Sequence, residues 1–283
     1  MRDTYDPVSP PVALTIAGSD SGGGAGIQAD LKTMTAHDVF GTAVVTATTA
    51  QNTGGVHDVV PSSPAHVSAQ YEAVVDDFEP AAAKTGMLAT REIVETVTGA
   101  IDEFDGPVVV DPVMVAATGD RLLSPEAEAA YDDLVAAATL VTPNADEAEV
   151  LVDDAVETPE DAAAAGRTLV DRGADAALVK GGHLGGDEER VVDTLVVDTT
   201  EGDSDVRRME NPRVETAATH GSGCVLSSAI AARLARGEPL VAAVGGAVDA
   251  MSEAIRRGYD VGDGPGAVNP TAMATERHPD GDP

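Results

Sequence analysis

Short apolar runs alternate with helix-like segments along most of the chain. The apolar runs consist mainly of Ala, Val, Ile, Leu and Thr and are predicted as strands over 12–17, 43–50, 82–85, 108–111, 139–142 and 176–179. The predicted helices between them cover 25–37, 64–77, 90–104, 124–137, 144–151 and 158–172. Continuous β-branched runs separated by helices are typical of buried parallel strands joined by βαβ crossovers. The pattern therefore predicts one doubly wound α/β domain.

The pattern changes in the last third of the chain. Short apolar groups within 190–216 are typical of a local antiparallel meander, and Ala-rich helices are expected over about 221–236 and 239–257. The sequence contains no internal repeat and no interdomain linker. The predicted organisation is a flexible lead-in, a single domain and a Gly/Pro/Asp-rich tail, at 1–11, 12–260 and 261–283.

Charge and hydropathy exclude several classes of protein. Asp and Glu number 49 against 17 Lys and Arg, a formal charge of −32. Such a chain repels a phosphate backbone and shows no basic patch, so we expect no nucleic-acid partner. No apolar run reaches 18 residues, and the N-terminus lacks the basic start and apolar stretch of a signal peptide. We therefore expect no membrane partner either.

Composition adds an expectation about the cellular environment. The lysines are Lys32, Lys84 and Lys180, while the acidic residues are dispersed. This combination is typical of a halophilic protein, in which molar salt screens self-repulsion within roughly 3 Å; an ordinary acidic enzyme is the alternative. Aromatic residues make up 2%, so small side chains must fill the interior. The single Cys224 excludes an intramolecular disulfide and a Cys-based zinc site, and fits a reducing cytoplasm.

A glycine-rich segment follows the first predicted strand. Ligands of doubly wound sheets bind beyond the carboxyl ends of strands, and here Gly22, Gly23, Gly24 and Gly26 allow close approach of backbone N–H groups. The segment lacks the Gly-Lys-Ser/Thr of a Walker A loop. It matches the loose dinucleotide fingerprint, but the acidic residue expected about 20 positions later is missing, which disfavours hydride transfer. A turn needed only for packing is the other interpretation.

Two further strand ends carry polar or flexible side chains. Gln51 offers an acceptor and two donors, which suit the edge of a neutral heterocycle, although a polar loop that ends the strand is an equal alternative. Lys84 follows a strand of small residues, so its charge must lie near a partner or a ligand. Met87 can cover a ring where aromatic residues are scarce, or can simply fill the core.

The next two strand ends place oxygen ligands together. Asp111 ends the most hydrophobic strand, and Thr142-Pro143-Asn144 ends the following one. Asn144 and Glu147 lie three residues apart on one face of a first helical turn. A carboxylate there can hold a hydrated Mg²⁺ together with phosphate oxygens, whereas an ordinary first-turn acid is favoured by the helix dipole alone.

The strongest local signal is Thr219-His220-Gly221-Ser222-Gly223-Cys224 before an apolar helix. Small residues at a helix start expose several N–H groups and about half a positive charge, a site for a phosphoryl group. We expect the helix terminus to stabilise a Cys224 thiolate, although a buried small hydrophobe is the alternative. Lys180 ends another strand beside two glycines, and His220 is expected to be a solvated loop residue.

Ordered blocks from about Val12 to Pro270 resemble those of the hydroxymethylpyrimidine/phosphomethylpyrimidine kinases, the thiamine-biosynthesis branch of the ribokinase-like superfamily. The blocks lie at 14–20, 23–32, 50–53, 84–88, 111–114, 142–144, 179–183 and 219–224. The resemblance implies an α/β/α three-layer sandwich with a mostly parallel central sheet and helices on both faces. It also implies ATP- and Mg²⁺-dependent phosphorylation of a hydroxymethylpyrimidine, first to the monophosphate and then to the diphosphate.

The resemblance also implies roles for particular residues. Those expected to line a pyrimidine pocket are Gly18, Ala25, Asp30, Gln51, Met87 and Val113. Those expected to bind nucleotide are Asp111, Thr142, Asn144 and Lys180, with Asp111 and Glu147 as the metal ligands. The expected catalytic set is Lys180, the anion hole Gly221, Ser222 and Gly223, and Cys224 where related sugar kinases have an aspartate base.

Departures and alternatives accompany this resemblance. Ser21-Gly22 replaces the more usual Pro-Ser, and Ala117-Thr118 replaces Lys-Ser, which removes one phosphate contact. The segment 117–121 is a candidate lid with Gly119 as hinge. The alternative functions are a pyridoxal or pyridoxine kinase and a non-catalytic pyrimidine sensor. A homodimer is expected from the superfamily.

Overall fold

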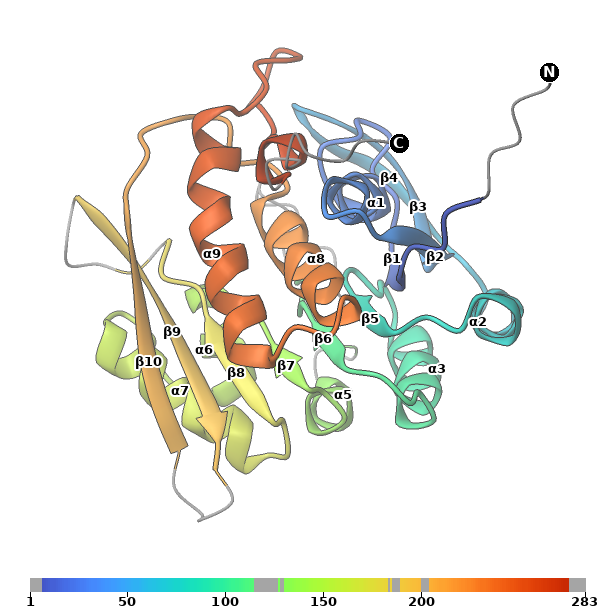
Figure 1. Ribbon diagram of the computed structural model, residues 1–283, viewed down its shortest axis with the longest axis horizontal. Coiled ribbons are helices and arrows are strands. Elements are labelled where there is room, and N and C mark those ends of the chain that lie inside the picture. Colours follow the sequence, from blue (N-terminus) through green and yellow to red (C-terminus); the bar gives the residue numbers. More distant parts are fainter. Residues whose placement is uncertain are drawn as a thin grey trace.

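An eight-stranded sheet forms the centre of the computed structural model, which describes residues 7–114, 127, 130–182, 184, 189–199 and 204–274 (Figure 1). Its spatial strand order is β10 (Ser204–Pro212), β9 (Arg190–Asp198), β8 (Ala176–Val179), β7 (Leu140–Val141), β6 (Val108–Val110), β5 (Ala82–Thr85), β1 (Val12–Ala17) and β2 (Phe40–Val45). Neighbours from β8 to β2 are parallel, whereas β9 and β10 run antiparallel at one edge.

Helices cover both faces of this sheet. One face packs against α1 (Gly26–Ala36), α8 (Ser222–Ala235) and α9 (Leu240–Arg256), of which α8 and α9 lie in front of the strands in Figure 1. The other face packs against α2 (Pro64–Phe78), α3 (Arg91–Asp102), α5 (Tyr131–Ala136), α6 (Ala145–Val152) and α7 (Pro159–Asp171). The fold is the expected α/β/α three-layer sandwich.

The strand sequences explain why both faces are covered. Successive side chains of a strand point to opposite faces, so a strand buried on both sides needs an unbroken apolar run. In β6, Val109 packs with the α8 and α9 layer, and Val108 and Val110 pack with the α3 and α5 layer. Ala13 and Leu14 of β1 divide between the layers in the same way.

The predicted strand 43–50 is wrong as a single element. The chain leaves the main sheet at Thr46, between β2 and β3 (Ala47–Asn52), and β3 pairs with β4 (Gly55–Pro61) as a separate antiparallel hairpin. The buried Thr46 hydroxyl donates to the Met87 carbonyl at 2.6 Å, which fixes the chain at this bend. β4 was not predicted, although the turn residues Thr53 and Gly54 between two extended runs are a hairpin signal.

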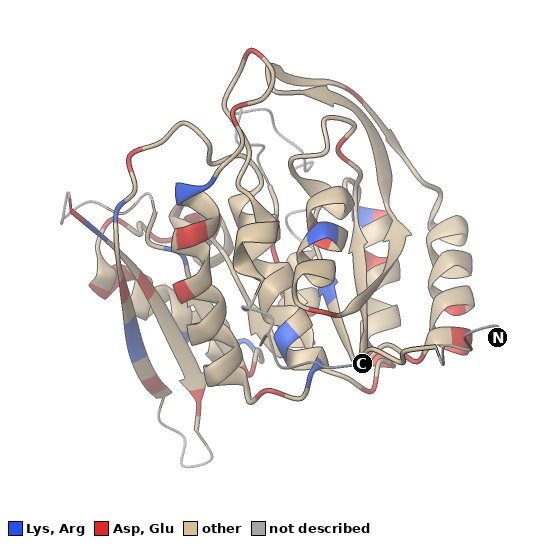
Figure 2. Ribbon diagram, turned by 45° about the horizontal axis from the view of Figure 1, so that its top comes forward, with Lys and Arg blue, Asp and Glu red and all other residues tan. Residues whose placement is uncertain are grey.

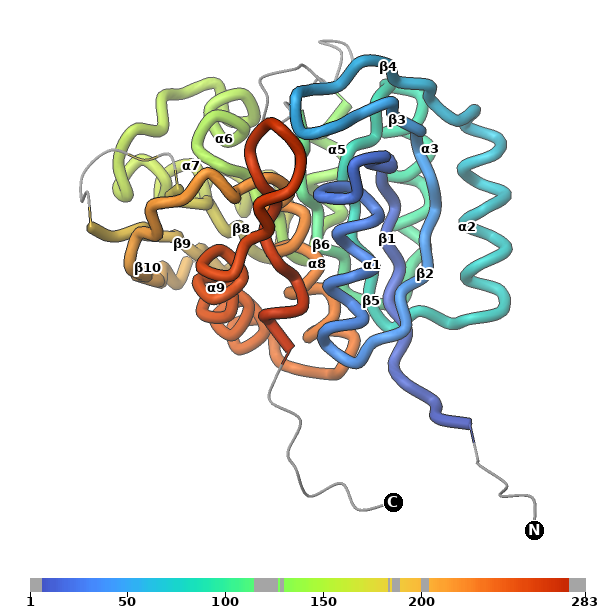
Figure 3. The backbone as a smooth tube through the Cα atoms, turned by 90° about the horizontal axis from the view of Figure 1, so that it is seen from above, coloured from blue at the N-terminus to red at the C-terminus, as the bar shows by residue number. Residues whose placement is uncertain are grey.

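The expected meander is confirmed, because β9 and β10 pair antiparallel along their whole length. The expected start of a tail at 261 is not confirmed, because the chain after 261 is partly packed on the domain. Val268 and Met273 are buried, and η1 (Pro270–Met273) packs on α1 and α9. Figure 3 shows the loop before η1 beside the β3–β4 hairpin, where the Gly264 N–H donates to Thr53 Oγ1 at 3.0 Å.

Several predictions lie outside the described residues. These are the lid 117–121, the departure at Ala117-Thr118 and most of the predicted helix before Tyr131. No helix in the described part of the chain is long and apolar enough to cross a membrane. Figure 2 shows acidic residues on helices, strands and loops around the fold instead of in one segment.

Candidate active site

Loops from five parallel strands meet at the carboxyl edge of the sheet. The Gly18 N–H, after β1, donates to the carbonyl of Met87, after β5, at 3.1 Å. Asp111, after β6, accepts hydrogen bonds from Thr142 Oγ1 at 3.2 Å and from Lys180 Nζ at 3.0 Å. Each of these contacts joins distant parts of the chain, since Lys180 and Asp111 are 69 positions apart. This edge is where ligands of doubly wound sheets bind.

A buried carboxylate organises the glycine-rich loop after β1. Asp20 is 2% exposed and accepts the N–H groups of Gly22, Gly24 and Ala25 at 2.8, 3.0 and 2.8 Å. Burial alone would raise the pKa of Asp20, but hydrogen bonds from His220 and from the loop amides lower it. Asp20 therefore holds the loop as a carboxylate, a role that the sequence reasoning did not assign.

His220 joins this loop to the start of α8. Its Nε2 lies 3.0 Å from Asp20 Oδ2, and its side chain is only 12% exposed, so the expectation of a solvated loop histidine is wrong. Gly221 has φ +77° and packs so closely on Gly24 that a Cβ would collide with the Gly24 carbonyl. Only glycine meets both demands, so the two loops pack backbone against backbone.

The expected pyrimidine-pocket residues divide into two groups. Three are partly exposed, namely Ala25, Gln51 and Val113, whereas Gly18 is buried. The Met87 side chain lies directly against Gly18, where any Cβ would collide with it. Gln51 is held beside the glycine-rich loop because its N–H donates to Ser21 Oγ at 2.7 Å. Gly18, Met87 and Gln51 therefore form one wall next to the glycine-rich loop.

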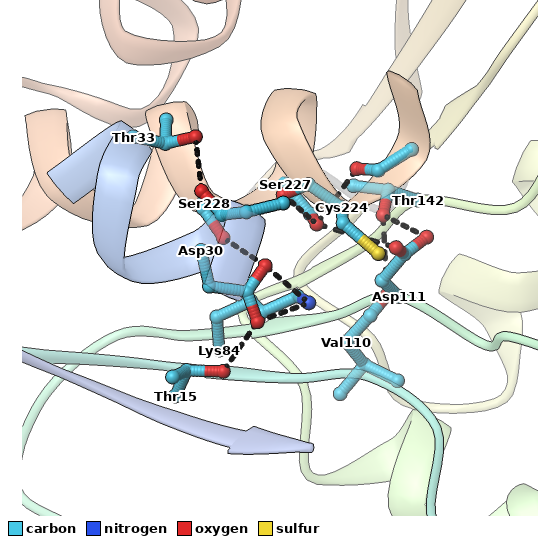
Figure 4. A network of polar contacts seen from close by, with 12 residues as sticks. Thr15, Asp30, Thr33, Lys84, Val110, Asp111, Thr142, Cys224, Ser227 and Ser228 are labelled. Atoms are coloured by element: carbon cyan, nitrogen blue, oxygen red, sulfur yellow. Dashed lines mark hydrogen bonds and ion pairs between the residues drawn. The ribbon is translucent and has the colours of Figure 1, made fainter. Parts of the chain in front are cut away.

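Asp30 does not share this wall, because it is fully buried beneath the loop. Its carboxylate forms an ion pair with Lys84 Nζ, which lies 3.1 Å from both oxygens (Figure 4). Thr15 Oγ1 and Ser228 Oγ also donate to it, each at 2.7 Å. The expectation that Asp30 lines a pocket is corrected accordingly: a carboxylate paired this completely is protected from water and ligand alike. The expectation that the Lys84 charge lies near a partner or a ligand is confirmed, because Asp30 is that partner.

Cys224 lies in the first turn of α8, where the partly exposed and the buried groups of expected pocket residues meet. Burial raises the pKa of its thiol to about 11, although the nearby Lys84 charge and a hydrogen bond from the Gly26 N–H act in the opposite direction. The expectation that the helix terminus would yield a stabilised thiolate is therefore wrong, because desolvation outweighs the groups that favour the thiolate. At neutral pH the sulfur is a protonated thiol.

Charged residues cluster on the other side of α8. Lys180 Nζ lies 3.0 Å from Asp111 Oδ1 and 3.7 Å from Glu147 Oε2. Ser227 Oγ donates to Asp111 at 3.3 Å, and a Cβ at Gly223 would lie 3.2 Å from Lys180 Nζ. The start of α8 therefore directly contacts this charged group, as an anion-binding helix terminus requires.

Asn144 and Glu147 form a capping box at the start of α6. The Asn144 N–H donates to Glu147 Oε2, and the Glu147 N–H donates to Asn144 Oδ1, both at 2.8 Å. Burial raises the pKa of Glu147 to about 7, against the effect of the Lys180 charge. Nearby charges from Lys180 and Lys84 instead lower the pKa of Asp111, although burial opposes them.

Asp111 and Glu147 are the candidate Mg²⁺ ligands of this charged group. Among the described residues, no three His, Cys, Asp or Glu side chains gather as an all-protein metal site. Asp111 and Glu147 both reach the same lysine ammonium, so two carboxylates face one point. Mg²⁺ commonly takes one or two carboxylates and completes its shell with water and substrate phosphates. The residues therefore fit a Mg²⁺ ion that arrives with a nucleotide.

Sequence reasoning missed the polar residues that support the site. Thr15, Ser227 and Ser228 are fully buried, and each donates to a site carboxylate. A signal existed for two of them, because Ser227 and Ser228 lie one helical turn after Gly223 and Cys224 in an otherwise apolar helix.

The fold and this site together define a class of protein. The chain has a doubly wound sheet, a glycine-rich helix start, and two carboxylates with a lysine beside them. This combination is typical of a small-molecule kinase. A family model described as phosphomethylpyrimidine kinase matches residues 20–269. The chain belongs to this family.

Named relatives and solved structures agree with the assignment. The hydroxymethylpyrimidine/phosphomethylpyrimidine kinase of Streptomyces coelicolor is 46% identical over 93% of this chain and 95% of the relative. That of Bacillus subtilis is 40% identical over 91% and 93%. The ADP complex of Bacillus subtilis pyridoxal kinase superposes with a TM-score of 0.84 at 34% identity, covering 94% of this chain and 99% of the other. Phosphomethylpyrimidine kinase from Clostridium difficile 630 gives 0.74 at 38% identity, covering 86% and 99%.

Proposed function

We propose that this kinase phosphorylates 4-amino-5-hydroxymethyl-2-methylpyrimidine with ATP, and then phosphorylates the monophosphate to the diphosphate, in thiamine biosynthesis. The named relatives at 40–46% identity support this assignment. The observation that carries it is the position of the α8 start, between the Gly18–Met87–Gln51 wall and the Asp111–Lys180 pair. A substrate ring and a nucleotide phosphate would meet there.

In this proposal the two sides of α8 would take different parts of the reaction. Gln51 would read the amino and ring-nitrogen edge of the pyrimidine, with Met87 against its face. The N–H groups of Gly221, Ser222 and Gly223 would bind the phosphoryl group in transfer, and Lys180, Thr142 and Asn144 the nucleotide phosphates. Asp111 and Glu147 would hold Mg²⁺, which supplies charge neutralisation of the phosphates when bound.

Cys224 would act as an acceptor that orients the substrate hydroxyl. Its thiol is protonated at neutral pH because burial raises the pKa to about 11. Phosphoryl transfer passes through a loose transition state and depends mainly on positioning and charge stabilisation, so a strong base is not required. The sulfur would accept the hydroxyl hydrogen bond and direct the oxygen toward the γ-phosphate.

An ATP-consumption assay in molar KCl with Mg²⁺ tests the proposal. The hydroxymethylpyrimidine, its monophosphate and pyridoxal are offered in parallel, and turnover of the first two is expected. The pyridoxal arm is included because a solved pyridoxal kinase superposes well on this fold. Turnover of pyridoxal alone would assign the chain to vitamin B6 salvage. Binding of the pyrimidine without any turnover would support the sensor instead.

The metal assignment has its own test. Glu147→Gln keeps the size of the side chain but removes the carboxylate that faces Lys180. We expect the Mg²⁺ concentration for half-maximal turnover to rise at least tenfold, with the KM for the pyrimidine unchanged. Asp146→Asn, the same change of charge at the neighbouring exposed position, is the control. An unchanged Mg²⁺ requirement in Glu147→Gln would contradict the assignment.

A further inference from the structure

The antiparallel direction of β9 carries the first part of this strand past the carboxyl end of β8. Val179, the last residue of β8, pairs with Thr194 of β9, whereas β9 already begins at Arg190. Residues 190–193, the β9 extension, therefore lie beyond the last pair of the two strands, in the part of the sheet where β9 and β10 form the edge (Figure 1). The chain leaves β8 at this point through residues 180–182, the Lys180 turn.

The β9 extension contacts the middle of the Lys180 turn. The Gly181 N–H donates to Asp193 Oδ1 at 2.7 Å. Gly181 is buried, and its backbone packs so closely on Val192 that a Cβ would collide with the Val192 carbonyl. A larger residue at 181 would therefore push the turn away from β9, and only glycine allows the two backbones to meet.

Arg213, which directly follows β10, holds the last residue of the Lys180 turn. Its Nη1 donates to the Gly182 carbonyl at 3.1 Å, and its Nη2 donates to the Arg190 carbonyl at 3.5 Å. A guanidinium is a planar fork of donors, so a single side chain can bind two carbonyls at once. Arg213 thus joins the end of the turn to the start of β9.

The backbone of Lys180 is also held from the side of β7. Its N–H donates to the Pro143 carbonyl at 2.8 Å. Its Nζ lies beside Asp111 and Glu147, as described above, and the side chain is only 15% exposed. The Lys180 turn is therefore fixed between the residues after β7 and the β9 extension, and this determines where the ammonium can reach.

We propose that Asp193 and Arg213 are positioning residues for Lys180, which fix the Lys180 turn on the β9 extension so that the ammonium lies beside Asp111 to receive a nucleotide phosphate. The proposal rests on the nucleotide-phosphate role proposed for Lys180 above. A lysine side chain is long and flexible, so a fixed backbone reduces the conformational freedom that is lost when the ammonium binds a phosphate. The meander then serves the nucleotide side of the site.

Binding of ADP with Mg²⁺, measured by isothermal titration calorimetry, tests this proposal. Asp193→Ala leaves the Gly181 N–H without its acceptor, and we expect the Kd for ADP to rise about tenfold. Asp193→Asn keeps an oxygen that can accept this N–H and is expected to stay within about threefold of the wild type. Asp198→Ala removes the same charge from an exposed position on the same strand, and as the control it is expected to bind ADP like the wild type.

A double-mutant cycle with Lys180→Gln separates positioning from a general loosening of the fold. A residue that acts only through Lys180 loses its effect when the ammonium is absent, so Asp193→Ala is expected to cause no further rise in Kd in the Lys180→Gln background. An equal rise in both backgrounds would overturn the proposal. A wild-type Kd in Asp193→Ala, or Asp193→Asn binding as weakly as Asp193→Ala, would overturn it as well.

Arg213→Ala covers the case in which Asp193→Ala does not fold. It removes the donors to Gly182 from a partly exposed position, and we expect the Kd for ADP to rise about threefold. Arg207→Ala on β10, which removes an exposed cation paired with Asp205, is the matched control and is expected to have no effect. An unchanged Kd in Arg213→Ala would overturn the proposal.

ADP binding involves no pyrimidine, so this proposal and the proposed function fail separately. The expected shifts in a protein that does not turn over the pyrimidine would overturn the proposed function and still support the positioning of Lys180. Pyrimidine turnover by the wild type, together with unchanged ADP affinity in the variants, would overturn the positioning alone.

Discussion

At the residue scale, we expect Cys224 and the backbone before it to contribute differently to the proposed reaction. The sulfur carries a proton at neutral pH because burial raises its pKa to about 11. The amides of Gly221, Ser222 and Gly223 need no proton transfer to bind a phosphoryl group, and preorganised donors of this kind often supply the largest part of catalysis. The anion hole is therefore expected to matter more than the sulfur.

Substitutions at 223 and 224 measure this difference. Cys224→Ser keeps a hydrogen-bonding group and is expected to retain at least about a tenth of wild-type kcat, whereas Gly223→Ala is expected to lose about a hundredfold or more. A Cβ at Gly223 would lie 3.2 Å from Lys180 Nζ. The control is Gly245→Ala in α9, where a Cβ meets nothing within 4 Å. Steady-state kinetics with the reverse order would give the main role to Cys224.

At the element scale, the loop after β1 and the start of α8 behave as one unit. The His220–Asp20 contact connects them, and the His220 N–H and C=O also pair with Gly266 and Val268 of the C-terminal segment. Three parts of the chain therefore meet at one residue, His220, through its ring and its backbone. A displacement of any one of them would move both the substrate wall and the anion hole.

His220→Ala is expected to affect both halves of the site together. Loss of the imidazole leaves Asp20 without one of its donors, so we expect the KM for the pyrimidine to rise and kcat to fall, each about five- to tenfold. His66→Ala on α2, an exposed histidine outside the site, is expected to leave both constants unchanged. A change in KM alone would show that the two loops move independently.

A buried histidine at the other end of α1 makes the stability of the fold depend on acid. His37 is 2% exposed, and burial together with the Arg233 and Arg236 charges lowers its pKa to about 4. The unfolded chain binds this proton at pH 6.5, so stability is complete above pH 6.5 and is lost as the pH falls toward 4. The whole window corresponds to about 3 kcal/mol of unfolding free energy. Urea unfolding at pH 7 and pH 4.5 should show the loss in the wild type and a smaller loss in His37→Asn.

At the scale of the whole molecule, a net charge of −32 is distributed over the fold. At low ionic strength these charges repel one another and oppose the compact state, whereas molar salt screens them within roughly 3 Å. The halophilic character remains a prediction, since the arrangement of charges alone does not fix the salt at which the chain is stable.

Thermal unfolding as a function of KCl tests that prediction. We expect Tm to rise by about 10 °C or more between 0.1 and 2 M KCl, because screening relieves self-repulsion in the folded state. Sucrose, which favours compact states without screening charge, is the control and is expected to give a smaller rise. A Tm that does not change with KCl would identify an ordinary acidic enzyme.

The sequence by itself determined the order of helices and parallel strands, the meander and the residues at the strand ends. These follow from local periodicity and from backbone freedom at glycines, which act within a few residues. The Asn144–Glu147 pair is likewise local, because a capping box needs only the spacing of one helical turn. The family resemblance rested on the same strand-end residues.

Only the tertiary structure decided the chemistry of the buried groups. It placed Asp30 opposite Lys84, 54 positions away, and His220 opposite Asp20, 200 positions away. It also desolvated Cys224, which reversed the expected direction of its pKa. Desolvation and charge pairing depend on which distant segments surround a group, so no local pattern in the chain contains them. The bend at Thr46 has the same origin, since the carbonyl that holds it belongs to Met87.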